Sequence, residues 1–447
     1  MFRSKYAITQ EILFEREAEN YAEFKRALTE LRARQKVFAD MPVTRRAALL
    51  SEFGSRLQSK RDELARMVCE EVGRCLRECE AELDKSVELI RYYSRLSPEL
   101  LAHKTIATQA SLSQVRFEPL GVVLAVMPWN YPIWQILRFA VSALCAGNAC
   151  AVKPAPSVAR VTAALFDLVG DELPLIPAWL SHDDVPHAIA DTDALAFTGS
   201  VEVGRILAGH AGAHLKKAVL ELGGSNAFIV LPDADLAQAA KDACYSRFRD
   251  AGQSCNAAKR IIVAEEVADE FTKLFLDECN RLKTGNPMLP QTTLAPLHRE
   301  DLRFRVHEQV LDAVENGAEI LCGGKPIEGS GWFYPATVLA GVTPRCRIYH
   351  EEVFGPVAVL VRARDAEDAV RLANDNPFGL GASIYSGDEN MAWHYAKELQ
   401  TGAVYINRHT SSDLRLPFGG VKSSGFGREL SEFGLYEFVN VKVYWQK

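Results

Sequence analysis

Between residues 118 and 224 the chain alternates short, continuously apolar segments with segments of helical periodicity. The first apolar segment, "GVVLAVMP" at 121–128, contains no charged residue, which is typical of a strand buried on both faces of a parallel sheet. An almost entirely apolar helix follows, with Pro132 in its first turn and Gly147 at its end. A second alternating unit runs from about 225 to 415. This alternation predicts an α/β protein with two doubly wound parallel sheets.

The charge and apolar content of the chain exclude several classes of protein. The 447 residues carry a formal net charge of −7, whereas nucleic acids and anionic membrane surfaces select proteins with a dominant basic face. No apolar run reaches the roughly 18 residues that a membrane-spanning helix needs, and the N-terminal segment lacks the apolar centre of a secretory signal. The sequence therefore predicts a cytoplasmic protein that binds neither nucleic acid nor membrane.

The ten cysteines form no CxxC and the cysteines and histidines form no mixed ligand cluster, so we expect reduced thiols and no metal. One cysteine stands apart. Cys255 lies in "DAGQSCNAAKR" (250–260), where small side chains replace the bulky apolar neighbours of a core cysteine. Composition alone favours a buried, inert thiol at such a position. The small neighbours nevertheless leave room for a ligand beside the sulfur.

Four predicted strands of the first unit end in distinctive segments. In a doubly wound sheet, ligands bind beyond the carboxyl ends of the strands. Gly199 and Ser200, followed by Gly204, come closest to a glycine-rich phosphate loop, although no GxGxxG is present. The four strand ends are "PWN" (128–130), "KPAPS" (153–157), "FTGS" (197–200) and "LELGG" (220–224).

Seven collinear motifs resemble those of the aldehyde dehydrogenase superfamily: "MPWNYP", "FTGSVEVG", "LELGGSN", "GQSC", "EEVFGPV", "NPFGLGAS" and "PFGGVKSSGFGRE". The resemblance runs from about residue 15 to the C-terminus and is closest to the succinate-semialdehyde dehydrogenase branch. It implies a dinucleotide-binding domain formed by 1–104 and 118–224 and a catalytic domain formed by 225–415. It also implies a small β oligomerisation element formed by 105–117 and 436–447.

The resemblance assigns three catalytic roles. Cys255 would attack an aldehyde as a thiolate, giving a thiohemiacetal that is oxidised to a thioester. The Asn130 amide would bind the developing oxyanion, although an asparagine here could also cap the following helix. Glu221 lies in an apolar strand, where burial should raise its pKa and make it a base that activates water. A structural salt bridge is the alternative role for Glu221.

The resemblance also implies that NAD or NADP is the cofactor. Position 156, often a glutamate that binds the adenosine ribose, is Pro156 here. Because that carboxylate would repel a 2′-phosphate, its loss leaves the choice between NAD and NADP open. The implied cofactor-binding residues are Trp129, Lys153, Ser157, Gly199, Ser200, Glu352 and Phe354.

The expected substrate is a small anionic aldehyde, with succinate semialdehyde the first candidate. Arg138 and Arg249 match positions that hold the substrate carboxylate in succinate-semialdehyde dehydrogenases, and Arg415 is a third candidate cation. A planar guanidinium can bind a carboxylate through two hydrogen bonds. Arg138 lies in an apolar helix, so a structural ion pair is an equally good explanation for its charge.

Other functions remain open at this level. The enzyme could oxidise a broad range of aliphatic or aromatic aldehydes, or pass the acyl group to coenzyme A. The coenzyme A branch typically lacks the water-activating glutamate, so Glu221 argues against it. A cysteine hydrolase would need a histidine base, and no histidine lies near Asn130, Glu221 or Cys255 in sequence. A protein that keeps the fold without activity is disfavoured because all three of these residues are present.

The two strand-like segments outside the main sheets, 105–117 and 437–445, would be aggregation-prone as free edges. Pairing between subunits would cover them, as the family resemblance implies. We therefore expect a homodimer or a dimer-based tetramer.

Overall fold

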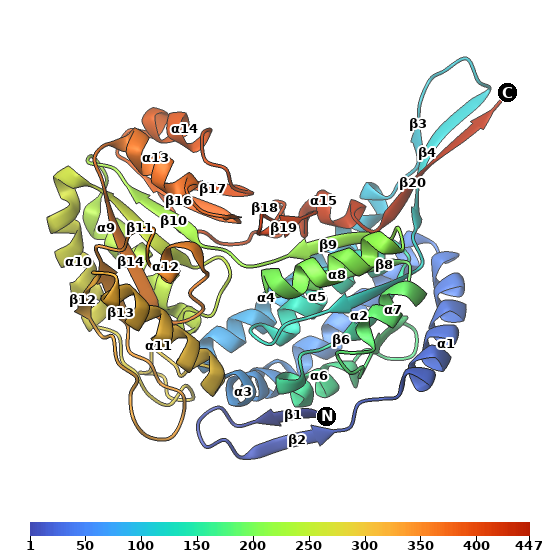
Figure 1. The fold of residues 1–447 in the computed structure, drawn as a ribbon. Coiled ribbons are helices and arrows are strands. Elements are labelled where there is room, and N and C mark those ends of the chain that lie inside the picture. The colour runs from blue at the N-terminus through green and yellow to red at the C-terminus, as the bar shows by residue number, and fades with distance from the viewer.

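The computed structural model describes residues 1–447 as two sheet-based bodies from which a narrow β arm projects (Figure 1). The first body contains a six-stranded sheet of order β19-β9-β8-β5-β6-β7, in which only β19 (Gly425–Phe426) is antiparallel. Its parallel strands are β5 (Val122–Val126), β6 (Ala149–Lys153), β7 (Leu175–Pro177), β8 (Ala194–Thr198) and β9 (Lys217–Glu221).

Helices cover both faces of this sheet because its strands are apolar on both sides. Val123 and Ala125 belong to one core, and Val122 and Leu124 belong to another on the opposite face. The helices of the first core are α2 (Val43–Ser59), α3 (Arg61–Val72), α4 (Leu76–Leu100), α5 (Pro132–Cys145) and α6 (Ala159–Phe166). Those of the second are α1 (Tyr21–Ala39), α7 (Val185–Asp191) and α8 (Val201–Ala213).

The second body contains a seven-stranded sheet of order β12-β13-β14-β11-β10-β16-β17, in which only the edge strand β12 (Glu319–Cys322) is antiparallel. The other strands are β10 (Asn226–Val230), β11 (Ala258–Ala264), β13 (Thr337–Ala340), β14 (Val357–Ala363), β16 (Gly381–Tyr385) and β17 (Ala403–Ile406). On one face lie α9 (Leu236–Phe248), α10 (Ala268–Asn280) and α11 (Glu300–Glu315), and on the other lie α13 (Ala366–Asn374) and α14 (Glu389–Ala396).

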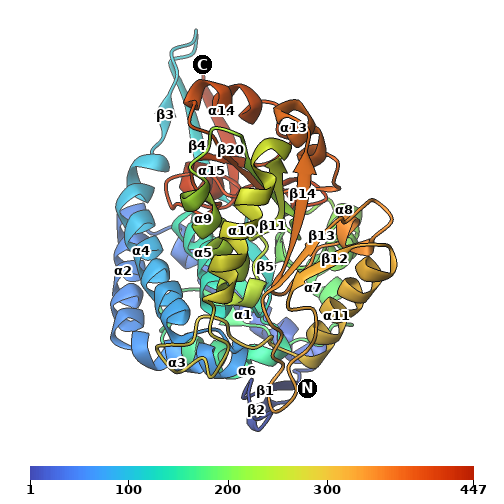
Figure 2. The ribbon, with the colours of Figure 1, turned by 90° about the vertical axis from the view of Figure 1, so that its left-hand side faces the viewer.

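The arm is a three-stranded antiparallel sheet of order β20-β4-β3 that extends away from both bodies (Figure 2). Its long strands are β4 (Leu112–Pro119) and β20 (Val439–Gln446), whereas β3 (Lys104–Thr105) has only two residues. The strand-like segment predicted at 105–117 is therefore the hairpin of β3 and β4, and β4 also pairs with the C-terminal tail and runs on to residue 119.

Sequence periodicity missed the N-terminal hairpin of β1 (Phe2–Lys5) and β2 (Ile12–Arg16). A tertiary contact stabilises it, because the Phe2 ring packs edge-on against Trp179 with 5.1 Å between ring centroids. No helix of the structure combines the length and the apolar character needed to cross a bilayer.

Candidate active site

Cys255 lies between the short helical turn η2 (Arg249–Gly252) and β11. Three successive residues of this turn, Asp250, Ala251 and Gly252, have positive φ values of 54°, 51° and 72°. Non-glycine residues in such conformations cost about 1–3 kcal/mol each, so surrounding contacts must hold the turn. The turn leaves Cys255 half-buried, whereas eight of the other nine cysteines are fully buried.

Buried charged side chains supply those contacts. The Arg74 Nε lies 2.6 Å from an Asp250 carboxylate oxygen, and the Tyr131 hydroxyl donates to the other oxygen of the same carboxylate. Arg247 donates to the Gly252 carbonyl at 2.8 Å. The sequence gives no sign of this network, because Arg74 lies 176 positions from Asp250. It holds the loop that carries the predicted nucleophile, residues 249–255 and called the nucleophile loop below, in its strained conformation.

The environment of the Cys255 thiol keeps it protonated at neutral pH. Burial raises its pKa to about 11, and the positive charges of Arg138 and Lys259 only partly oppose that effect. Since the thiolate is the nucleophilic form, deprotonation must accompany attack. Glu221 lies close enough for its charge to act on the thiol.

Asn130 faces the nucleophile loop from the carboxyl end of β5. Its side-chain Nδ2 donates to the Gln253 carbonyl at 3.1 Å, two residues before Cys255. It does not cap α5, because the Glu82 carboxylate accepts the first free N–H groups of that helix, those of Ile133 and Trp134, at 3.0 and 2.9 Å. The helix-cap alternative is therefore absent, and the amide is placed beside the loop that carries the sulfur.

Glu221 ends β9 with only 3% of its surface exposed. Neither of its carboxylate oxygens has a hydrogen-bond partner within the chain, so no salt bridge accounts for it. Burial, followed by repulsion from Glu429, raises its pKa well above the ordinary carboxylate range, and Arg138 opposes this rise. A buried carboxylate without partners is suited to hold and transfer a proton.

Arg138 forms a buried ion pair with Glu429. Glu429 was not singled out from the sequence, although it ends the quoted motif "PFGGVKSSGFGRE". The pair lies beside Glu221, whose pKa responds to both of its members. Arg138 also lines the pocket that contains Cys255, so its structural role and its predicted substrate role are compatible.

Lys153, at the carboxyl end of β6, is a buried cation without an acidic partner. It is 2% exposed, and burial alone lowers its pKa to about 8. Nearby, the Trp129 ring stacks on His298 with 4.3 Å between centroids and meets Phe354 edge-on at 5.8 Å. An unpaired buried ammonium beside an aromatic wall fits an anionic or hydroxyl-rich cofactor such as a dinucleotide.

The other predicted cofactor residues lie around the same sheet edge. Gly199 and Ser200 precede α8, and the Ser200 hydroxyl accepts from the Val203 N–H at 3.4 Å. Ser157 is 2.7 Å from the His298 Nε2, an interaction that the sequence did not predict. Pro156 begins the turn η1 (Pro156–Val158) and supplies no carboxylate there.

Glu352 joins the cofactor residues to the nucleophile loop. Its carboxylate lies 3.0 Å from the Lys259 ammonium, which also donates to the Cys255 carbonyl at 2.9 Å. The glycine pair after Glu221 makes this approach possible. A Cβ at Gly223 would meet the Glu352 carboxylate at 2.5 Å, and one at Gly224 would meet the Cys255 carbonyl at 2.6 Å.

A pocket of about 160 Å³ opens beside Cys255. It is smaller than drug-sized sites, which span roughly 300–1,000 Å³, and so suits a small substrate. Arg138 and Arg249 both line it, as does Lys85, which sequence reasoning missed. Arg415 does not line it, because its side chain is 77% exposed and pairs with Asp413 at 2.7 Å.

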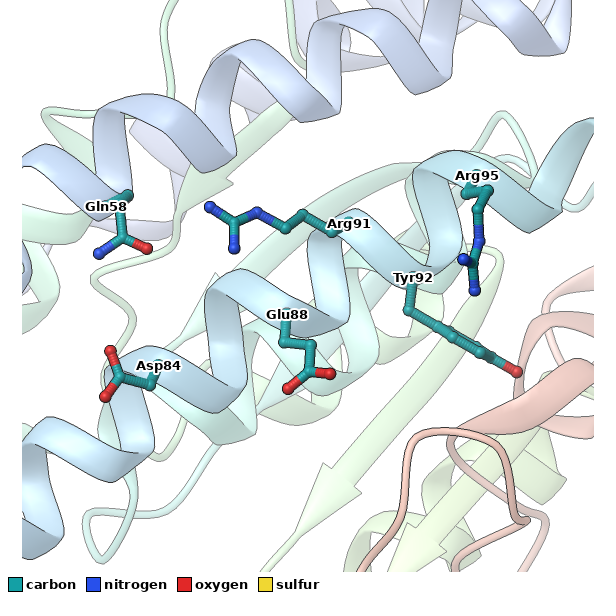
Figure 3. Close-up of a pocket in the computed structure, with 6 residues that line it drawn as sticks. All are labelled: Gln58, Asp84, Glu88, Arg91, Tyr92 and Arg95. Atoms are coloured by element: carbon teal, nitrogen blue, oxygen red, sulfur yellow. The ribbon is translucent and has the colours of Figure 1, made fainter.

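A larger hollow of about 500 Å³ lies on the outer side of α4 (Figure 3). It is wide open and lined by charges of both signs, and none of the predicted catalytic residues reaches it. The predicted catalytic cysteine therefore lies at the smaller pocket. The residues around the hollow are Gln58, Asp84, Glu88, Arg91, Tyr92 and Arg95.

A half-buried cysteine beside the carboxyl ends of a doubly wound sheet suits an enzyme that works through a covalent intermediate next to a bound dinucleotide. The model of the aldehyde dehydrogenase family matches residues 2–444, so the chain belongs to that family.

Curated relatives and solved structures agree with this assignment. The chain is 43% identical to the succinate semialdehyde dehydrogenase [NAD(P)+] of Escherichia coli (strain K12), over 90% of this chain and 88% of that protein. It is 41% identical to a probable succinate-semialdehyde dehydrogenase [NADP(+)] of Synechocystis sp., over 91% of each chain. The crystal structure of succinic semialdehyde dehydrogenase from Streptococcus pyogenes with NADP+ superimposes with a TM-score of 0.97 at 33% identity, covering 100% of this chain and 99% of that one.

Proposed function

We propose that this aldehyde dehydrogenase oxidises succinate semialdehyde to succinate with NAD or NADP. The observation that carries the proposal is the placing of Cys255, Arg138 and Arg249 around one small pocket. There the aldehyde carbon of the substrate could reach the Cys255 sulfur while its distal carboxylate binds Arg138 and Arg249. The relatives named succinate semialdehyde dehydrogenase support the same substrate.

In the first step the Cys255 sulfur adds to the aldehyde carbon and the carbonyl oxygen becomes an oxyanion. The Asn130 amide, aimed at the nucleophile loop, donates a hydrogen bond to that oxygen. Removing one such donor in other enzymes costs about 2.7–4 kcal/mol of transition-state stabilisation. The thiol proton leaves to solvent as the bond forms, and the positive charges of Arg138 and Lys259 favour the thiolate.

The second step is the oxidation of the thiohemiacetal to a thioester. A nicotinamide cofactor, when bound, would accept the hydride. Lys153, Ser200 and Trp129 would hold the adenosine and pyrophosphate portion, and Glu352 and Phe354 the nicotinamide ribose. Lys259 contacts both the Glu352 carboxylate and the Cys255 carbonyl. It therefore links the segment that would hold the cofactor to the loop that carries Cys255.

In the third step water cleaves the thioester. Glu221 takes a proton from the water as its oxygen attacks the thioester carbon, and the Cys255 thiol is released with the carboxylic acid. The raised pKa of Glu221 brings its titration toward the working pH, as efficient general-base catalysis requires. Hydrolysis by this base is also the reason to favour water over coenzyme A as the acyl acceptor.

Purified protein assayed for aldehyde-dependent nicotinamide absorbance, with each cofactor and with and without coenzyme A, tests the proposal as a whole. Succinate semialdehyde should be preferred over butanal, and coenzyme A should not be required. Preference for butanal would overturn the proposed substrate.

Substitution of Arg249 by glutamine is expected to reduce discrimination between these two aldehydes. Its Nε lies 3.6 Å from Asp250, too far for a hydrogen bond, so Asp250 does not occupy the N–H donors that could bind a substrate carboxylate. Loss of a charged hydrogen bond costs about 1.5–3 kcal/mol, so kcat/KM for succinate semialdehyde relative to butanal should fall by roughly 10- to 150-fold.

Arg249 gives a cleaner test than Arg138 because Arg138 also neutralises Glu429. Arg138→Ala would leave a buried carboxylate unpaired beside Glu221 and should slow both substrates. The exposed Arg415 offers a matched control, and Arg415→Gln should leave the ratio at the wild-type value. An unchanged ratio in Arg249→Gln would remove Arg249 from substrate recognition.

We also propose that the protein is a homodimer or a dimer-based tetramer. β20 is an edge strand whose Val441, Val443 and Trp445 are each more than half exposed. Light scattering at micromolar concentration should give at least twice the chain mass of 49.5 kDa. Val443→Lys, which places a charge on that edge, should shift the population toward monomer. A wild-type monomer would contradict the proposal.

A further inference from the structure

The cations of the pocket beside Cys255 differ in how far their charge is already compensated. Four of them line it: Arg74, Lys85, Arg138 and Arg249. Three have a carboxylate within 4.0 Å, with Arg74 beside Glu82 and Asp250, Arg138 beside Glu429, and Arg249 beside Asp250. Lys85 has none. Lys85 is therefore the one cation of the pocket whose charge no nearby carboxylate neutralises.

The hydrogen bonds of Lys85 leave a donor free as well. Its ammonium donates to the carbonyl oxygen of Ser412 at 2.8 Å and to the hydroxyl of the same residue at 2.5 Å. It also lies 4.5 Å from the centroid of the Trp134 ring. An ammonium group has three N–H donors, so one remains for a ligand.

We propose that Lys85 is a specificity-determining residue that binds the distal carboxylate of the substrate together with Arg249. The inference rests on the proposed oxidation of an anionic aldehyde. It adds a residue that recognises the negative charge of that substrate. Arg138 contributes less to this recognition because Glu429 already neutralises it. Ser412 holds the Lys85 side chain in place, and the Trp134 ring flanks it.

The surroundings of Lys85 give this role a distinctive dependence on pH. Burial, and then repulsion from Arg249 and Arg138, lowers the pKa of Lys85 to about 8, while Asp413 and Glu88 oppose the shift. Lys85 is therefore charged at pH 7 and loses its charge as the pH rises through 8. Anion binding should weaken over the same range.

The remaining acids of the pocket titrate elsewhere. Burial, followed by repulsion from Asp250, raises the pKa of Glu78 to about 7, so its ionisation is largely complete above pH 8. Asp250 has a lowered pKa and stays ionised, since Arg74 and Arg249 outweigh its burial. Burial raises the pKa of Glu82, and this carboxylate is ion-paired with Arg74. A fall in the substrate ratio centred at a pH above the Glu78 pKa of about 7 therefore reports on Lys85.

The test compares kcat/KM for succinate semialdehyde with kcat/KM for butanal in three variants. In Lys85→Met the ratio should fall by roughly 10- to 150-fold, as for loss of a charged hydrogen bond. Lys85→Arg should restore most of the ratio. Arg91→Met removes one positive charge from the outward face of the same helix and should keep the wild-type ratio. Inhibition of butanal oxidation by succinate should weaken in Lys85→Met in parallel.

The ratio is then measured in wild type and in Lys85→Arg from pH 7.5 to 9.5. It should fall with rising pH in wild type and stay level in Lys85→Arg, because arginine keeps its charge over this range. Butanal serves as the internal reference for titrations of Cys255 and Glu221. A purely structural lysine would not produce this difference.

The inference is overturned if the wild-type ratio is flat with pH, or if Lys85→Met lowers both substrates equally. Either result with a wild-type preference for succinate semialdehyde removes Lys85 alone and leaves the proposed function standing. A wild-type preference for butanal overturns the proposed function itself.

Discussion

Replacing Cys255 by alanine is expected to abolish aldehyde oxidation, because no other side chain that lines the pocket is a thiol that can carry the acyl group as a thioester. Steady-state turnover should fall below detection with either cofactor. The predicted cofactor contacts at Lys153 and Ser200 lie on another sheet, so the variant should still bind the dinucleotide. Protein fluorescence quenching on cofactor addition measures this directly.

Cys322 provides a matched control for this experiment. It is the other cysteine that is not fully buried, and it lies on β12 away from the pocket. Cys322→Ala should keep wild-type turnover, and iodoacetamide should inactivate it as it does wild type. Substantial aldehyde oxidation by Cys255→Ala would contradict the assignment of Cys255 as the nucleophile.

Substitution of Glu221 by glutamine should stop the cycle at the thioester. The amide is nearly the same size as the carboxylate but cannot take a proton from water. General-base catalysis contributes roughly 10²- to 10⁴-fold, so steady-state turnover should fall by about that factor. A rapid burst of NAD(P)H, stoichiometric with enzyme, should precede the slow phase in stopped-flow traces.

The pH dependence of the same variant gives an independent check. Burial raises the Glu221 pKa well above the ordinary carboxylate range, so the active carboxylate form is lost as pH falls through that raised value. Wild-type deacylation should therefore weaken at a higher pH than an ordinary carboxylate would allow, and this limb should vanish in Glu221→Gln. Glu432→Gln, an exposed change on α15 (Ser431–Tyr436), should preserve it. An unchanged steady-state rate in Glu221→Gln would remove this residue from the mechanism.

The sequence alone determined the fold class and the parts of the site that lie at strand ends. Runs such as "GVVLAVMP" can be buried on both faces only inside a parallel sheet covered by helices, and the structure confirms this at β5. Asn130, Lys153, Ser200 and Glu221 follow or end strands of that sheet. Because parallel strands share one carboxyl edge, their places in the chain already implied their proximity.

Local sequence patterns did not predict contacts between residues that lie far apart in the chain. The N-terminal hairpin depends on Phe2 meeting Trp179, and β4 pairs with β20 at the other end of the chain. Both cases are set by partners more than a hundred or several hundred positions away, which periodicity does not register.

Only the tertiary structure decided the electrostatics of the site. The protonated state of Cys255, the raised pKa of Glu221 and the pairing of Arg138 with Glu429 each depend on burial and on charges brought in from other elements. The same is true of Lys85, which in sequence is one charge among many on an amphipathic helix. A charge acts over a few ångströms in a low-dielectric interior, so its effect is set by neighbours in space and not by neighbours in the chain.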